Sequence, residues 1–178
     1  MTDTMTTDGD AVELDFSHES SDDFDALSRD VVPVRSMAAG DLDTLVRIDR
    51  KITGRDRRPY YERKVTEALE ESGIRMSLVA EIDNHVVGFI MANVDYGEFG
   101  VAEREAVIHS IGVDPSFAHH HIGAALLSQL LANLSSLRVE TVMTEIDWNS
   151  RHMTGLLAFL KDCGFTPSAR IPLARRLD

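Results

Sequence analysis

The chain has 178 residues, of which 43% are hydrophobic and 27% are charged, and its formal net charge is −12. This length suits one domain with a core of its own. No window approaches the roughly 20 apolar residues that span a bilayer, and the first residues lack the basic and apolar regions of a secretion signal. A lone cysteine, Cys163, permits no internal disulfide. We therefore expect a protein of the reducing cytoplasm, without a membrane partner.

The negative charge is concentrated at the N-terminus. Residues 1–30 contain ten acids and one base, a net charge of −9, which leaves −3 for residues 31–178. The composition of residues 1–30 predicts an acidic, disordered tail, followed by one folded domain over 31–178. The small charge of that domain argues against a nucleic-acid partner.

The first half of the domain reads as a strand, two helices and a hairpin. Residues 31–37 favour an edge strand, because they contain a proline. Residues 39–52 and 60–72 have the apolar spacing of helices, although Asp49 interrupts the apolar stripe of the first. Residues 75–95 predict two strands that turn at Asp83 and Asn84.

The second half alternates strands and helices. The sequence predicts a strand at 105–113, a helix at 122–136, a strand at 138–147, a helix at 150–163, and one or two short strands at 165–178. The order β-α-α-β-β-β-α-β-α-β predicts an α/β class protein, an α+β mixed sheet flanked by helices, in a single domain.

Residues 113–127, VDPSFAHHHIGAALL, lead from a strand into a helix through three consecutive histidines. The first N–H groups of a helix lack internal partners and attract anions, so a diphosphate suits this turn. Zinc needs three or four convergent ligands, which adjacent residues do not easily provide, and no further Cys or His cluster supports them. We therefore expect no physiological metal.

Three motifs and the element order together resemble the GNAT superfamily of acetyl-CoA-dependent N-acetyltransferases. SIGVDP matches the family's strand end, IGAALL its helix start, and WNSRHMTGLLAFLKDCGF its Asn-initiated helix that closes on Gly-Phe. The resemblance covers roughly residues 31–178. It implies a GNAT-like fold and the transfer of an acetyl group from acetyl-CoA to an amine of a small molecule or a protein. Dimerisation is common in the family, and a homodimer stays open.

The resemblance also implies a set of cofactor contacts. The strand end would bind the pantetheine arm through its backbone, the turn would bind the diphosphate, and Asn149 would contact pantetheine. These residues are Ile111, Gly112, Val113, His119, His120, His121, Ile122, Gly123, Ala124 and Asn149. Ala118 replaces the usual Gln or Arg, and His121 replaces the first motif glycine. We expect imidazoles beside the diphosphate to become partly protonated and to offset the missing Arg.

Catalysis in the family takes place where this strand splays from its neighbour, here around residues 143–146. Strand periodicity predicts that Glu105, Val107, His109, Ile111 and Val113 share one face. His109 is the candidate general base, or else a half-buried histidine satisfied by a carbonyl. Glu105 is a second candidate for base or amine binding.

The family's usual acid, a Tyr, is replaced by Leu160. Tyr96, Tyr60 and Tyr61 are the candidate replacements, while Cys163 is expected to pack as a small apolar residue. Since a leaving thiolate also takes a proton from water, the substitution does not by itself imply inactivity.

Residues 49–64 fall where the family's substrate-shaping helices lie. Arg57, Arg58, Tyr60 and Tyr61 would line or gate the acceptor pocket there, or else form a solvated loop whose Tyr rings pack on the sheet. A rival hypothesis is a catalytically weakened acyl-CoA-binding regulatory or interaction module. The replaced motif residues and the acidic tail favour the rival; the intact strand end and the base candidate favour an enzyme.

Overall fold

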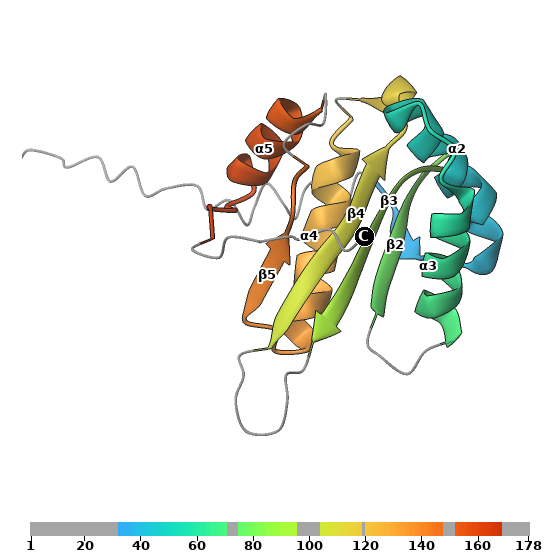
Figure 1. Ribbon diagram of the computed structural model, residues 1–178. Coiled ribbons are helices and arrows are strands. Elements are labelled where there is room, and N and C mark those ends of the chain that lie inside the picture. Colours follow the sequence, from blue (N-terminus) through green and yellow to red (C-terminus); the bar gives the residue numbers. More distant parts are fainter. Residues whose placement is uncertain (1–31, 71–74, 96–103, 119, 148–151, 169–178) are drawn as a thin grey trace, which may run out of the picture.

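The computed structural model describes residues 32–70, 75–95, 104–118, 120–147 and 152–168 (Figure 1). The first elements are β1 (Val34–Ser36), the 3-10 helix η1 (Ala39–Asp41), α2 (Leu42–Thr53), α3 (Arg58–Glu70), β2 (Arg75–Ile82) and β3 (His85–Asp95). They are followed by β4 (Glu105–Val113), the 3-10 helix η2 (Pro115–Phe117), α4 (Ile122–Ser136), β5 (Thr141–Thr144) and α5 (Met153–Asp162).

The strands form one mixed sheet in the order β1-β2-β3-β4-β5. The first four are antiparallel neighbours, and β5 is parallel to β4. A parallel pair needs a crossover connection, and α4 provides it between β4 and β5. Helices α2 and α3 lie on one face of the sheet and α4 on the other, with α5 beside α4 (Figure 1).

Each face of the sheet carries its own apolar core. The core on the α4 face joins Ile90 and Ile108 of the sheet to Leu126 and Leu130 of α4, and Leu160 of α5 packs against them. The core on the opposite face joins the sheet to α2 and α3; its members are Met37, Leu45, Val46, Ile48, Tyr61, Val65, Val79, Phe89 and Met91. Alternating side chains of β3 serve the two cores in turn, as strand geometry requires.

Local sequence explains several of the boundaries. Asp83 and Asn84 adopt φ of 50° and 62°, which a two-residue type I′ hairpin needs at both central positions. Gly54 ends α2 in the left-handed conformation, at φ 71°, and its N–H bonds the Arg50 carbonyl at 2.9 Å. The hairpin predicted at Asp83 and Asn84 is thus confirmed, with the turn geometry that its residues favour.

The predicted fold class and element order are confirmed over the described residues. β1 lies at the sheet edge, as expected from Pro33. The helix predicted from residue 39 begins as η1, and the strand predicted over 138–147 is shorter, at Thr141–Thr144. Of the predicted C-terminal strands, residues 165–168 have no regular structure, and the rest lie outside the described residues, as does the predicted tail. Among the described helices, none is long and apolar enough to cross a membrane.

Candidate active site

Strands β4 and β5 part midway along β4. Their parallel pairing runs from Glu105 and Thr141 to Ile108 and Thr144, and over the described residues it extends no further. Beyond Ile108, β4 continues to Val113 paired only with β3 in this part of the sheet. The backbone of Ile111, Gly112 and Val113 therefore has one edge bonded to β3 and the other turned away from any β5 ladder. The predicted splay of the two strands is present.

A β-bulge at His109 sits at this divergence. Met91 pairs with Ser110 and Ala92 with Ile108, so His109 is an extra residue in β4. The bulge overturns the prediction that Glu105, Val107, His109, Ile111 and Val113 share one face. Ala106 and Ile108 pack in the α4-side core before the bulge, and Ile111 and Val113 pack against that same core after it. The phase of side-chain alternation therefore reverses at His109.

The two base candidates occupy different parts of β4. His109 is exposed, so its ring is not the half-buried side chain of the alternative interpretation. Glu105 begins β4, opposite Thr141, in the segment that still pairs with β5. At about 3.3 Å per residue, it lies roughly 13 Å along the strand from His109. Only His109 therefore lies at the point where the strands part.

Close packing explains the glycine of the strand end. A Cβ on Gly112 would approach the Phe89 ring to 2.8 Å and Ile52 to 3.2 Å. Any side chain there would push the α2-side core away from β4. Gly112 thus lets α2 pack closely on the segment that has left β5.

The predicted diphosphate turn has the geometry of a helix start. Helix α4 begins at Ile122, and its first intrahelical bond runs from the Ala125 N–H to the His121 carbonyl at 2.9 Å. The N–H groups of Ile122, Gly123 and Ala124 precede this bond and point along the helix axis, where they suit an anion. A Cβ on Gly123 would meet its nearest neighbour, Phe159, at 3.5 Å, an ordinary contact, so internal packing does not require glycine there.

His121 adopts the left-handed conformation, with φ 55° and ψ 12°. This is the conformation that glycine adopts freely, and His121 occupies the place of the first motif glycine. His120 turns back on the loop, with Nδ1 at 2.9 Å from the Ala118 carbonyl and 3.2 Å from the Phe117 carbonyl. Both rings are exposed. His119 lies outside the described residues.

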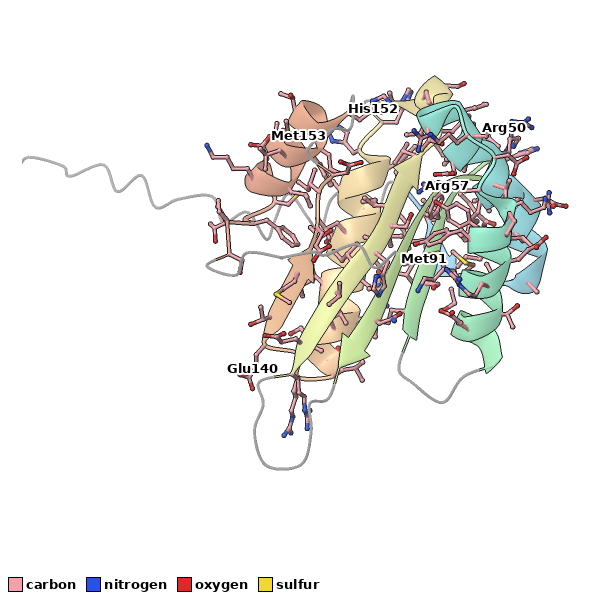
Figure 2. All side chains as sticks on the ribbon, in the orientation of Figure 1. Arg50, Arg57, Met91, Glu140, His152 and Met153 are labelled. Carbon is pink, nitrogen blue, oxygen red and sulfur yellow. The ribbon has the colours of Figure 1, made fainter. Side chains whose placement is uncertain are left out.

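Residues at the C-terminal end of α2 contact the end of β4 and the start of α5, on either side of the predicted diphosphate turn. Lys51 Nζ lies 2.9 and 2.7 Å from the two carboxylate oxygens of Asp114, which directly follows β4. Burial alone would raise the pKa of Asp114, but hydrogen bonds from Lys51 and Ser116 outweigh it and hold that pKa below its usual range. His152, before α5, contacts the Ile52 carbonyl at 3.1 Å. His152 and Met153 accordingly lie at the same end of the molecule as Arg50 of α2 (Figure 2).

A polar cluster, buried at Asp49 and Tyr61, connects α2 and α3 to β4. Arg57 Nε donates to Asp49 at 2.8 Å, and its Nη2 bonds the other oxygen of the same carboxylate. The Tyr61 hydroxyl donates to Asp49 at 3.1 Å and lies 3.2 Å from Ser110 Oγ. Burial raises the pKa of the Tyr61 hydroxyl well above its ordinary value, so it stays protonated. Arg57 lies where α3 begins, over the sheet (Figure 2).

The other predicted acceptor residues are placed as follows. Tyr61 is fully buried, and its ring packs edge-on against Phe89 at 5.6 Å, so this Tyr ring does pack on the sheet. Tyr60 is half-buried, edge-on to Tyr61 at 5.0 Å. Arg58 is exposed and pairs with Asp43 at 2.7 Å. Tyr96 and Asn149 lie outside the described residues.

The position of the family's acid is apolar and closed. Leu160 is 4% exposed and belongs to the α4-side core, against which Cys163 also packs. Cys163 therefore packs as predicted, and Leu160 has no acidic proton to donate to a leaving group. Among the described residues, no three His, Cys, Asp or Glu side chains gather to hold a metal ion.

Sequence reasoning missed Asp49, Ser110 and the Lys51–Asp114 pair. Asp49 left one signal, since it interrupts an apolar helix stripe, yet it is only 3% exposed. A carboxylate at a core position needs partners, and here they are Arg57, just before α3, and Tyr61 of α3.

Comparison with known proteins agrees with this architecture. A family model described as Acetyltransferase (GNAT) family matches residues 42–165. The match covers more than half of the chain, so the chain belongs to the GNAT acetyltransferase family. It is an acyltransferase of the GNAT type. A search of curated proteins finds no match.

Solved structures show the same fold. A transcriptional regulator from Bacillus halodurans aligns with a TM-score of 0.68 at 18% identity, over 82% of this chain and 99% of that one. Aminoglycoside N-acetyltransferase AAC(6')-Iy in complex with CoA aligns at 0.67 and 16%, over 82% and 94%. Glucosamine-6-phosphate N-acetyltransferase from Arabidopsis thaliana aligns at 0.62 and 14%, over 83% and 99%. At these identities the likeness concerns the fold alone.

Proposed function

We propose that this protein transfers an acetyl group from acetyl-CoA to an amine of a small molecule or a protein. The observation that carries the proposal is the parting of β4 from β5 after Ile108, directly before the turn into α4. This arrangement offers a strand edge and a helix N-terminus in succession. A similar aminoglycoside N-acetyltransferase structure bound to CoA supports an acyl-CoA donor. The names of that structure and of a similar glucosamine-6-phosphate N-acetyltransferase support an amine acceptor.

The residues present fit an acyl-CoA. The backbone groups of Ile111, Gly112 and Val113 on the edge away from β3 match the amide groups of a pantetheine arm. The first-turn N–H groups of α4 suit the diphosphate, and the small side chains of Gly123 and Ala124 crowd it little. In this proposal these groups orient the thioester at the parting of the strands, where His109 is exposed.

Bound acetyl-CoA supplies the activated acyl carbon. The neutral amine nitrogen bonds to that carbon, the C–S bond breaks, and the thiolate leaves with the electron pair. His109 accepts the proton that the amine loses, directly or through water. The thiolate takes a proton from water, since Leu160 provides none, and the proton that His109 then releases to solvent neutralises the remaining hydroxide.

Calorimetry and an assay of thiol release test the proposal. We expect acetyl-CoA to bind the purified protein, and free CoA thiol to appear when an amine is added. The amines are neamine, glucosamine 6-phosphate and Nα-acetyl-lysine amide, whose side-chain amine is free. Absence of acetyl-CoA binding rejects the proposal. Binding without turnover of any amine rejects transfer to this panel and favours an acyl-CoA-binding module.

His109→Gln tests the base. Because general-base catalysis contributes about 10²–10⁴-fold, we expect kcat at pH 7.5 to fall by about 10²-fold while acetyl-CoA affinity is kept. An imidazole acts as a base only when neutral, so the wild type should also lose activity below neutral pH and the variant should lose that dependence.

His85→Gln is the matched control for this substitution. His85 is another exposed histidine of the same sheet, at the β2–β3 turn, and its replacement should leave the rate and the pH profile unchanged. Unaltered activity in His109→Gln would remove His109 from the mechanism.

A further inference from the structure

Ser110 Oγ is the end of a hydrogen-bonded chain that begins at a buried carboxylate. The Tyr61 hydroxyl lies 3.1 Å from Asp49 Oδ1 and 3.2 Å from Ser110 Oγ. Tyr61 is fully buried and Asp49 is 3% exposed, whereas Ser110 is half-buried and retains contact with solvent. These hydrogen bonds therefore lead from the buried Asp49, on the α2 side of the sheet, to the accessible Ser110 on β4.

The donor in each of these hydrogen bonds can be assigned. Asp49 accepts two hydrogen bonds from the Arg57 guanidinium, the pairing of an ionised carboxylate, which has no proton to donate. The single Tyr61 proton therefore goes to Asp49. Ser110 must then donate its own proton to the Tyr61 oxygen, which fixes the hydroxyl rotor. The lone pairs of Ser110 Oγ consequently face away from Tyr61 and can only accept.

Ser110 lies where the acyl group and the amine would meet. It directly follows the bulge residue His109 and precedes Ile111, in the part of β4 that has left β5. Its link to Tyr61 places its side chain on the α2 and α3 face, opposite the α4 face that provides the diphosphate turn. An acceptor that approaches from the α2 side would pass Ser110 before it reaches the thioester.

We propose that Ser110 selects the acceptor by accepting a hydrogen bond from its amine, with Tyr61 and Asp49 as positioning residues. This inference rests on the proposed N-acetyltransfer. A neutral primary amine has two N–H groups, so one can bond Ser110 while the other faces the base. A secondary amine has one N–H and cannot satisfy both. Ser110 would therefore set how strongly the site prefers a primary amine to its N-methyl counterpart.

The test measures kcat/KM for the best amine of the panel and for its N-methyl counterpart. Ser110→Ala should lower kcat/KM for the primary amine about three- to tenfold, the effect of one neutral hydrogen bond, while KM for acetyl-CoA is unchanged. The preference for the primary over the N-methyl amine should shrink by a similar factor. Ser110→Thr keeps the hydroxyl and should restore most of the preference.

Tyr61→Phe tests the hydrogen bond that orients Ser110 without changing the size of the acceptor site. This variant frees the Ser110 hydroxyl to rotate without enlarging the acceptor site, so it too should lower the preference. The double variant, Ser110→Ala with Tyr61→Phe, should show the same preference as Ser110→Ala, because both changes act on the same hydrogen bond from the amine to Ser110. Melting temperatures verify that each variant is folded.

Ser77→Ala is the matched control. Ser77 of β2 pairs with Met91, which pairs with Ser110, so the two serines occupy one row on the same face of the sheet. Replacing Ser77 should leave the preference unchanged.

Three outcomes overturn the inference. If an amine is acetylated but Ser110→Ala leaves its kcat/KM unchanged, the role of Ser110 is rejected while the proposed function stands. Additive effects in the double variant reject the role of Tyr61 as positioning residue. Binding of acetyl-CoA without acetylation of any amine removes the proposed function and this inference together.

Discussion

His121 shows how a residue other than glycine can adopt the backbone conformation of a glycine position. Its φ of 55° lies in the left-handed region, which histidine adopts more often than most side chains, yet at a cost of about 1–2 kcal/mol. The same position lies at the N-terminus of α4, where an anion is stabilised. Histidine in place of glycine therefore makes the left-handed conformation less favourable, but it places an imidazole beside the proposed diphosphate.

We expect His121→Gly and His121→Val to separate these two effects. In urea unfolding, the Gly variant should stay within about 1 kcal/mol of the wild type, while the β-branched Val should lose about 1–2 kcal/mol in the left-handed conformation. In calorimetry, the Gly variant should bind acetyl-CoA more weakly than the wild type, because it lacks the ring beside the proposed diphosphate. Equal affinity of the two would contradict a role for His121.

At the scale of elements, the C-terminal turn of α2 organises the site. Within two turns, Asp49 of this helix bonds Tyr61 of α3, and Lys51 bonds Asp114 at the end of β4. The Ile52 carbonyl of the same helix contacts His152 before α5. The apolar side of the same turn packs on Gly112. Changes in α2 should therefore affect the strand end that the acyl-CoA would use.

Asp114→Asn tests this anchoring. The pKa of Asp114 is lowered on folding, so the carboxylate stabilises the folded state above its unfolded value, 3.8, and this contribution is lost as pH falls through the lower folded value. We expect the variant to be about 1–3 kcal/mol less stable at pH 7, by urea unfolding. Because the wild type loses the contribution in acid, the difference between the two should shrink as the pH falls below 3.8.

Asp43→Asn is the control, because Asp43 is also paired, with Arg58, but is 81% exposed. Removal of a surface pair should cost under about 1 kcal/mol. Equal losses from the two variants would show that the buried position of Asp114 adds nothing.

Sequence patterns revealed this fold better than its site. Apolar periodicity and the Asp83-Asn84 turn sufficed for the elements, because those signals are local. The bulge at His109 has no such signal: one extra residue reverses the faces of a strand without changing its composition. The partners of Asp49 are equally hidden, since Tyr61 lies 12 positions away and Tyr61 is separated from Ser110 by 49. Contacts between elements decide these features.

At the scale of the molecule, the sheet separates two kinds of interior. The α4 side is an apolar core through Leu126 and Leu130 that fixes the helix start proposed for the diphosphate. The α2 side combines an apolar core with the buried polar groups of Asp49 and Tyr61. Under the two proposals, donor binding would use one face and acceptor selection the other, with the parted strands between them.

The charge distribution predicts an effect of residues 1–30 on the anionic donor. These residues contribute −9 of the net −12, so their removal leaves −3. We expect the shortened chain to unfold within about 0.5 kcal/mol of the full chain. It should bind acetyl-CoA more tightly in 0.05 M salt, and the gain should vanish in 0.5 M salt, where the screening length is only about 4 Å.

A full-length variant with the ten acids of residues 1–30 changed to Asn or Gln separates charge from length. If electrostatic repulsion is the cause, this neutral variant should match the shortened chain at both salt concentrations in calorimetry. A gain that persists in high salt, or that appears only on shortening, would instead assign the effect to the segment's bulk. A loss of affinity on shortening would contradict repulsion altogether and show that residues 1–30 contribute to donor binding.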